Sequence, residues 1–427
     1  MALPLLVKKL LIRTGLARFL PSVQRLTEGG GDFLRYYSDR LLTAPYAELR
    51  EAADWLGTPG PDVIDLALGA PRFDLVPSAS TKLPAHRRGL PPPQGLPELR
   101  QAVADRLFGG LGPGGRPAGD VLITHGAAGA FSVALESFVN PGDRVVLFDP
   151  TSPLFILALR HRRARVRWVP ARAEQGRLRF RLDHLARALR RARLVVVNSP
   201  ANPTGGAIAP EDLEQIAWWA NRHDVLVYSD EAFAAYQYEG TPCPVASFRP
   251  ARQRTLTAGG VSQAYALASA RVGWLAGCPH LIRPCTLAGV LQTPFVPTLC
   301  QQLALAAVRL GPEALAPVRA EFASRRRYAF ERLQALGLKP AWPAGAYFLW
   351  LPVQDLGLDG RAFAEGLLKT KRVLVWPGSH FGPGGAGHVR VSYAAEDGRL
   401  REGLGRLAEF VRELGARPPQ TAAKRAA

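Results

Sequence analysis

The sequence has few cysteines, few lysines and no long apolar run. No stretch approaches about 20 uninterrupted apolar residues, so a membrane-spanning helix is not expected. The four cysteines are not spaced as metal ligands usually are, and no metal site is predicted; they are Cys243, Cys278, Cys285 and Cys300. So few cysteines in 427 residues indicate a reducing compartment or simple packing, and we expect a cytoplasmic protein.

Lysine supplies only seven of the 54 basic residues, and the other 47 are arginines dispersed along the chain. The net charge of +19 could attract nucleic acid or an anionic surface. No recognisable nucleic-acid-binding motif accompanies this charge, so no nucleic-acid partner is expected. A hydrophobic content of 47% with 21% charged residues is typical of a globular protein, and the length suffices for two domains.

The first 27 residues contain no acidic side chain, and their leucines recur near helical spacing among lysines and arginines. This pattern allows an amphipathic helix on an anionic membrane surface, a transit-like segment, or a helix packed on the protein body or across a dimer. We assign residues 1–45 to a basic amphipathic extension and residues 418–427 to a disordered tail.

Three motifs follow apolar runs that look like strands. Asn198–Gly205 reads Asn-Ser-Pro-Ala-Asn-Pro-Thr-Gly, Asp230 closes the run 225–228, and Gly126–Ala130 follows 121–123. A glycine-rich turn before a helix offers backbone N–H groups to an anion. A carboxylate at a strand's carboxyl end lies where open α/β sheets bind ligands. Further along, Arg390 offers a planar fork that matches a carboxylate.

These motifs stand in the order found in class I/II aminotransferases, and the chain resembles that family over roughly residues 60–410. Gly95–Arg100, Ser262–Leu267 and Arg271–Trp274 add to the likeness. The resemblance implies an α/β fold of the pyridoxal-phosphate (PLP) fold type I, with a mostly parallel seven-stranded sheet. It implies a large domain over 90–300 and a smaller α+β domain built from 46–89 and 301–417.

The resemblance also assigns roles to individual residues. It implies that the cofactor is held by the following residues: Ala127, Ala128, Asn202, Asp230, Ser262 and Arg271. Gly69 and Arg390 would bind the carboxylate of an amino or oxo acid. Family members are usually homodimers, so a homodimer is expected.

Gln263 occupies the position of the family's catalytic lysine, eight residues before the phosphate-binding Arg271. A glutamine can neither bind the cofactor covalently nor act as an acid or base near neutral pH. Four further positions differ from the family. At these positions the family contacts the cofactor with an aromatic ring, a tyrosine, a serine and a tyrosine of the dimer partner. The corresponding residues here are Ser152, Phe233, Gly260 and Leu90. No other lysine lies in a matching motif.

Each retained residue also has a plain structural interpretation. Asn202 could serve only the turn that contains Pro-Thr-Gly, and Asp230 could be a solvated strand end. Arg271 could pair with an internal carboxylate. His125, before the Gly126 turn, fits a packed histidine better than a base.

Three functional hypotheses follow. The first is a divergent enzyme that binds a carboxylate-bearing amino or oxo acid, with PLP or pyridoxamine phosphate held non-covalently or absent. The second is a non-catalytic scaffold or regulatory protein. The third, a conventional transaminase with an unrecognised base, is the least favoured.

Overall fold

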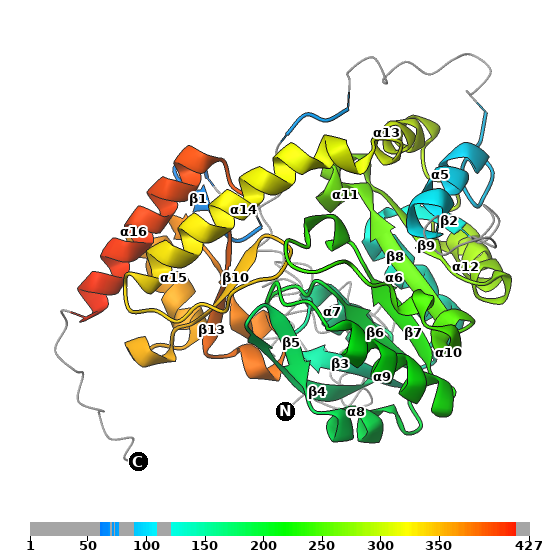
Figure 1. The fold of residues 1–427 in the computed structure, drawn as a ribbon, viewed down its shortest axis with the longest axis horizontal. Helices are drawn as coiled ribbons and strands as arrows, with labels where there is room; N and C mark the ends of the chain where they lie inside the picture. The colour runs from blue at the N-terminus through cyan, green and yellow to red at the C-terminus, as the bar shows by residue number, and fades with distance from the viewer. Residues whose placement is uncertain (1–59, 69–70, 72, 77–88, 109–120, 416–427) are drawn as a thin grey trace, which may run out of the picture.

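The computed structural model describes residues 60–68, 71, 73–76, 89–108 and 121–415 (Figure 1). The amphipathic extension 1–45, the predicted substrate residue Gly69 and the tail 418–427 lie outside these residues. Among the described residues, no helix is both long and apolar enough to cross a membrane, and no cluster of metal-ligating side chains occurs.

The large lobe is built on an eight-stranded sheet in the order β2-β9-β8-β7-β6-β3-β4-β5. The strands are β2 (Val121–His125), β3 (Arg144–Asp149), β4 (Arg165–Glu174), β5 (Arg177–Phe180), β6 (Leu194–Asn198), β7 (Leu226–Asp230), β8 (Thr255–Gly260) and β9 (Val272–Ala276). The five strands from β8 to β4 run parallel, whereas β9 is antiparallel to both of its neighbours. The predicted α/β fold with a mostly parallel sheet is confirmed, and the short strand β5, which was not predicted, adds an eighth strand.

Helices cover both faces of this sheet, and its central strands β6, β7 and β8 are buried along almost their whole length, as is usual for parallel sheets. One face packs against α6 (Gly126–Phe138), α7 (Pro153–His161) and α12 (Pro279–Gln292). The other face packs against α8 (Leu182–Leu189), α9 (Pro210–Arg222) and α10 (Arg249–Arg252). α5 (Pro97–Phe108) and α13 (Thr298–Val308) pack together beside β2 and β9.

The smaller lobe holds a three-stranded antiparallel sheet in the order β10-β13-β12 and a short parallel pair, β1 with β11. These strands are β1 (Ile64–Asp65), β10 (Phe348–Pro352), β11 (Val373–Leu374), β12 (Trp376–Pro377) and β13 (His388–Ser392). α15 (Gly360–Lys371) and α16 (Asp397–Gly415) pack on them. The division into domains stays a prediction, and the packing of α13 on α5 runs across the predicted boundary at residue 300.

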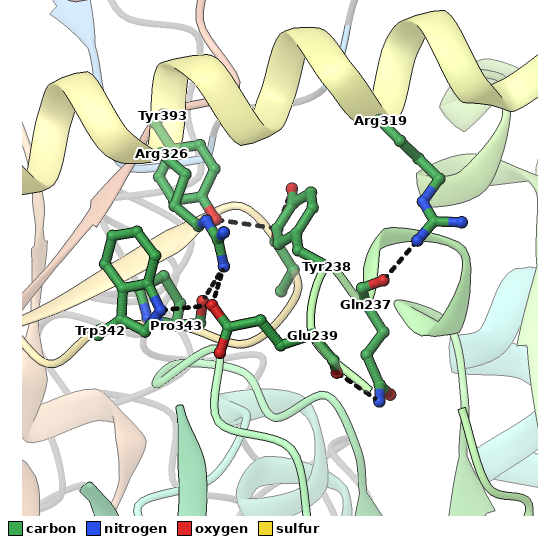
Figure 2. Close-up of polar contacts among 9 residues, drawn as sticks. Gln237, Tyr238, Glu239, Arg319, Arg326, Trp342, Pro343 and Tyr393 are labelled. Atoms are coloured by element: carbon green, nitrogen blue, oxygen red, sulfur yellow. Dashed lines mark hydrogen bonds and ion pairs between the residues drawn. The ribbon is translucent and has the colours of Figure 1, made fainter. Parts of the chain in front are cut away.

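The long helix α14 (Pro312–Gln334) runs from α13 at the large lobe to α16 in the smaller lobe (Figure 1). Figure 2 shows Arg326 reaching from α14 toward Glu239, which follows β7 by nine residues. The Arg326 guanidinium donates to Glu239 Oε1 at 3.0 Å and to Pro343 O at 2.7 Å, and it lies 4.2 Å from the centre of the Trp342 ring. This cluster, in which Arg326 is buried and Glu239 is exposed, ties α14 to a loop of the large lobe.

Candidate functional site

The predicted site residues come together because their strands end at one edge of the large sheet. In the parallel register Asn198 of β6 pairs with Asp230 of β7, and Asp230 pairs with Ala258 of β8. β9 runs the opposite way, so its start, directly after Arg271, faces the last residues of β2 and β8. This edge is the crevice in which α/β sheets of this kind bind ligands.

An anion cradle lies where β2 passes into α6. Gly126 has a φ of +69°, which favours glycine, and a Cβ at this position would lie 2.7 Å from Arg271 Nη2. The guanidinium is therefore directly against the turn, and it also donates to Ser262 Oγ at 3.4 Å. The residue before the helix, His125, makes no side-chain cap. The first N–H groups of α6, those of Ala127 and Ala128 included, therefore receive no cap from this side chain, and their binding of an anion stays a prediction.

Asp230 is a buried carboxylate, 9% exposed, at the floor of the crevice. Its Oδ1 accepts one backbone hydrogen bond, from Ala232 N at 3.1 Å. Burial raises the pKa of Asp230 from 3.8 to about 6, because the hydrogen bond from Ala232 offsets only part of the lost hydration. A carboxylate with this burial is suited to a cationic N–H partner supplied by a ligand.

Arg390 of β13 points into an aromatic box and is 3% exposed. Its guanidinium carbon lies 4.0 Å from the ring centre of Phe348, 4.7 Å from that of Trp376 and 5.1 Å from that of Phe381. Nη1 donates to Asn202 Oδ1 at 2.7 Å. Nη2 donates to the Ala67 carbonyl, whereas buried Nε has no partner in the described part of the chain.

Asn202 is therefore joined to Arg390, and its own backbone N–H donates to Asn198 Oδ1 at 2.7 Å. Burial lowers the pKa of Arg390 to about 9, while Tyr347 and the Asp65 carboxylate act to raise it. A cation this far removed from water gains when a carboxylate binds it. The pair Asn202 and Arg390 can thus present a carboxylate-binding fork.

Gln263 lies on the short helix α11 (Val261–Ala264), and its Oε1 accepts a hydrogen bond from the hydroxyl of Tyr347. Tyr347 is 1% exposed, and burial raises its pKa well above the usual value. The tyrosine therefore stays protonated at neutral pH and acts as a donor. Neither side chain of this pair can accept a proton readily.

Two of the other substituted positions, Phe233 and Gly260, lie beside these residues. Phe233 packs edge-on against Tyr347 and Phe348, at 5.3 and 5.5 Å between ring centres. A Cβ on Gly260 would lie 3.8 Å from Ala127 N, which places this glycine beside the anion cradle. Ser152 begins α7 without making a cap, and Leu90 is 79% exposed.

His125 is adjacent to the cradle and partly buried. Burial and the nearby Arg271 charge lower its pKa, although a hydrogen bond with the Phe295 backbone acts in the opposite direction. Its Nε2 has no partner among the described residues. This environment keeps the imidazole neutral, and the packed interpretation remains the prediction.

Three features of the site were not predicted from the sequence: the tyrosine partner of Gln263, the aromatic box around Arg390, and the hydrogen bond between Asn198 and Asn202. Tyr347 lies 84 residues from Gln263, and the box joins β10, β12 and the segment after β12. The Asn198 link alone had a local signal, because the two asparagines stand four residues apart at a strand end.

Comparison with known proteins assigns this chain to a family. The sequence model of the family Aminotransferase class I and II matches residues 61–407. The chain belongs to the class I and II aminotransferases. Aspartate aminotransferase of Pyrococcus abyssi is 31% identical over 88% of this chain and 98% of its own length. Arginine–pyruvate transaminase of Pseudomonas aeruginosa is 30% identical over 83% and 91%.

Solved structures of such aminotransferases have the same fold. Aspartate aminotransferase from Thermus thermophilus, solved with maleate, superposes with a TM-score of 0.75 and 30% identity, and covers 87% of this chain and 99% of its own. Aspartate aminotransferase from Thermotoga maritima gives a TM-score of 0.78 at 27% identity, over 88% and 100%. Class I and II aminotransferases are PLP-dependent enzymes, and this chain has their fold.

Proposed function

We propose that this protein binds a carboxylate-bearing amino or oxo acid at Arg390, with PLP or pyridoxamine phosphate held beside it non-covalently. The proposal rests on the surroundings of Arg390. Its side chain is buried and donates hydrogen bonds to Asn202 and Ala67, and its Nε has no partner among the described residues. A ligand carboxylate would supply the missing negative charge. The maleate in the Thermus thermophilus structure is a dicarboxylate, which supports this ligand class.

The residues around the crevice fit a phosphorylated pyridine on two sides. Arg271, Ser262 and the first N–H groups of α6 would hold the phosphate, and Asp230 would accept the ring N–H. When bound, such a cofactor supplies an electron sink for carbanion chemistry. The protein's own part is to orient the ring and to exclude water.

Ordinary transamination is not part of the proposal, because the lysine position holds no base. Gln263 is neutral, and Tyr347 stays protonated against it. A proton that leaves or reaches a bound amino acid would need another acceptor. We infer that an exogenous or ligand-borne base takes this role, or that no proton transfer occurs.

The second candidate is a non-catalytic, regulatory relative that keeps the fold. It is favoured by substitutions at five positions for which the family resemblance implies a cofactor contact: Ser152, Phe233, Gly260, Gln263 and Leu90. A conventional transaminase with a substitute base is the least favoured, since among the described residues lysine occurs only at positions 339, 369 and 371.

The test is a titration of the purified protein with PLP and with pyridoxamine phosphate, followed by absorbance, alongside Gln263→Lys and Arg271→Ala. We expect saturable PLP binding in the natural protein without an adduct after borohydride treatment, a trapped mass increase in Gln263→Lys, and loss of binding in Arg271→Ala. A trapped adduct in the natural protein would show a substitute lysine. No binding in any variant would favour the cofactor-free, regulatory alternative.

We also propose that the protein is a homodimer, as the family resemblance implies. Leu287 and Leu291 of α12 are 68% and 86% exposed, and Leu90 is 79% exposed. Large apolar side chains that gather on one helix favour burial against a second copy. Light scattering should give twice the chain mass, and Leu291→Glu should lower it to one chain. A monomeric natural protein would contradict this proposal.

A further inference from the structure

A large cavity of about 1040 Å³ has none of Asn202, Asp230, Gln263, Arg271 or Arg390 in its lining, although Asp149 at the end of β3 and Thr204 of the Asn198–Gly205 motif place it at the same edge of the sheet. Its walls are the β4–β5 hairpin of the large lobe and, opposite, the segment 339–342 with parts of β10 and β13. Ligand pockets usually measure about 300–1,000 Å³, so this cavity can hold a molecule larger than an amino acid. Neither the family assignment nor the proposed function uses it.

The segment that supplies one wall carries much of the protein's charge. Residues 160–193 contain 13 arginines and two acidic residues, Glu174 and Asp183. Arg172, Arg179 and Arg181 of this segment line the cavity, and so does Lys339 of the other lobe, whose ammonium lies 3.7 Å from Asp355 Oδ2. Arg172 is exposed and has no polar partner among the described residues, whereas Arg181 is paired with Asp183 at 2.9 Å. A cleft whose lining carries an excess of one sign of charge concentrates ions of the opposite sign.

Two carboxylates also line the cavity, and they do not cancel this charge. Both oxygens of Asp149 accept the backbone N–H of Gly384, at 2.9 and 3.1 Å, and burial raises the pKa of Asp149. Glu174 is exposed at the hairpin. Arg179 is also 3.8 Å from Asp212 of α9, which does not line the cavity. Four cations therefore line the cavity against two anions, and the buried anion, Asp149, is already engaged by a backbone N–H. Three of the four cations also lie near a carboxylate outside the lining, whereas Arg172 has no ion-pair partner among the described residues; the three pairs are Arg179–Asp212, Arg181–Asp183 and Lys339–Asp355.

The wall opposite the arginines is aromatic and rigid. Figure 2 shows Trp342 held in place: its Nε1 donates to Glu239 Oε1 at 2.6 Å, and the Arg326 guanidinium lies over its ring. Phe330 packs edge-on against it at 4.8 Å. Deeper in the cavity, Trp350 stacks on His388 at 4.9 Å, and His388 Nδ1 is a buried atom without a partner in the described part of the chain. Fixed aromatic faces are suited to stack a planar ring.

We propose that this cavity binds a polyanion that carries a planar ring, of the class of nucleoside polyphosphates. The phosphates lie against Arg172 and Arg179, and the ring lies against Trp342. The two walls belong to different lobes, so both recognition elements are available only in the folded protein.

The test uses calorimetric titration with three probes: ATP, tripolyphosphate and adenosine. Three variants accompany the natural protein: the double variant Arg172→Ala/Arg179→Ala, the double variant Arg165→Ala/Arg167→Ala, and Arg271→Ala. Arg165 and Arg167 are exposed on the same strand β4 and do not line the cavity, so the second pair removes equal charge from the same region. Circular dichroism confirms that each variant is folded.

We expect ATP to bind with a stoichiometry of one, and tripolyphosphate and adenosine to bind at least about ten-fold more weakly. The cavity pair should weaken ATP binding about ten-fold or more, and the β4 control pair less than about three-fold, because close charge pairs outweigh distant ones in salt. Equal losses in both pairs, or tripolyphosphate binding as tight as ATP, would mean non-specific attraction and overturn the proposal. Loss of ATP binding in Arg271→Ala would place the probe in the anion cradle and overturn it as well. Absence of saturable ATP binding would refute the ligand class.

Discussion

Replacing Asp230 with asparagine should stabilise the ligand-free protein at neutral and alkaline pH. The carboxylate is 9% exposed, and burial raises its pKa from 3.8 to about 6. In the unfolded chain it ionises near its usual value, so between these two pH values the folded protein binds more protons than the unfolded one. The stability associated with Asp230 is therefore fully present at low pH and is lost as the pH rises through about 6.

The magnitude follows from the pKa difference of roughly two units, at 1.36 kcal/mol for each, which gives about 3 kcal/mol. An asparagine side chain would keep the shape and the acceptor for Ala232 N, but it would carry no charge to bury. The free energy of unfolding of Asp230→Asn should thus exceed that of the natural protein by up to about 3 kcal/mol at pH 8, and match it below about pH 4.

The assay is guanidinium unfolding at a series of pH values, with Glu214→Gln as the control because Glu214 is an exposed carboxylate on α9. The control should change the unfolding free energy by less than about 0.5 kcal/mol at every pH. A variant at position 230 that is less stable at pH 8, or whose gain does not depend on pH, would refute the electrostatic account. The ionised Asp230 side chain would then be stabilised by its contacts in the folded protein, and its burial would not lower the free energy of unfolding.

Three other results are expected. Gly126→Ala should destabilise the protein by about 1–2 kcal/mol and weaken phosphate binding. The added methyl group would meet Arg271, and a φ of +69° is strained for alanine. Thermal unfolding with and without phosphate checks both effects, and a variant with unchanged stability and phosphate binding would contradict them. Arg390→Lys should weaken maleate binding at least about ten-fold in calorimetry, since lysine cannot form the fork; equal affinity would place the anion elsewhere. Tyr347→Phe should cost about 1 kcal/mol of stability by leaving Gln263 Oε1 without its donor, and a neutral result in denaturant unfolding would show that water replaces the hydroxyl.

The sequence allowed the strand ends of the site to be predicted, because apolar runs and the turn residues after them are local signals. Asn202, Asp230 and the Gly126 turn indeed gather at one edge of the sheet. Their functional roles stay predictions. The strand β5 had no such signal: Arg177–Phe180 is a short run that alternates arginine with an apolar residue, and it pairs only at the sheet edge.

The surroundings of Arg390 and Gln263 could not be predicted from the sequence, for a different reason. Each depends on side chains from distant segments. The rings around Arg390 meet within the smaller lobe, where β10 and β12 pair with β13, whereas Tyr347 meets Gln263 across the two lobes. Phe348 and Tyr347 are part of an apolar run that looks like any buried strand. Only the tertiary fold distinguishes a ring that fills the core from one that encloses a guanidinium.

The Arg326 cluster has a bearing on how the protein melts. Proteins with two lobes can unfold in separate steps when few contacts join the lobes. Here Arg326 on α14 is 8% exposed and shares Glu239 with Trp342, so unfolding of the large lobe alone would leave the buried guanidinium without its carboxylate. Partial unfolding is thereby disfavoured. The two lobes should consequently behave as one cooperative unit, with a single heat-capacity peak in calorimetry.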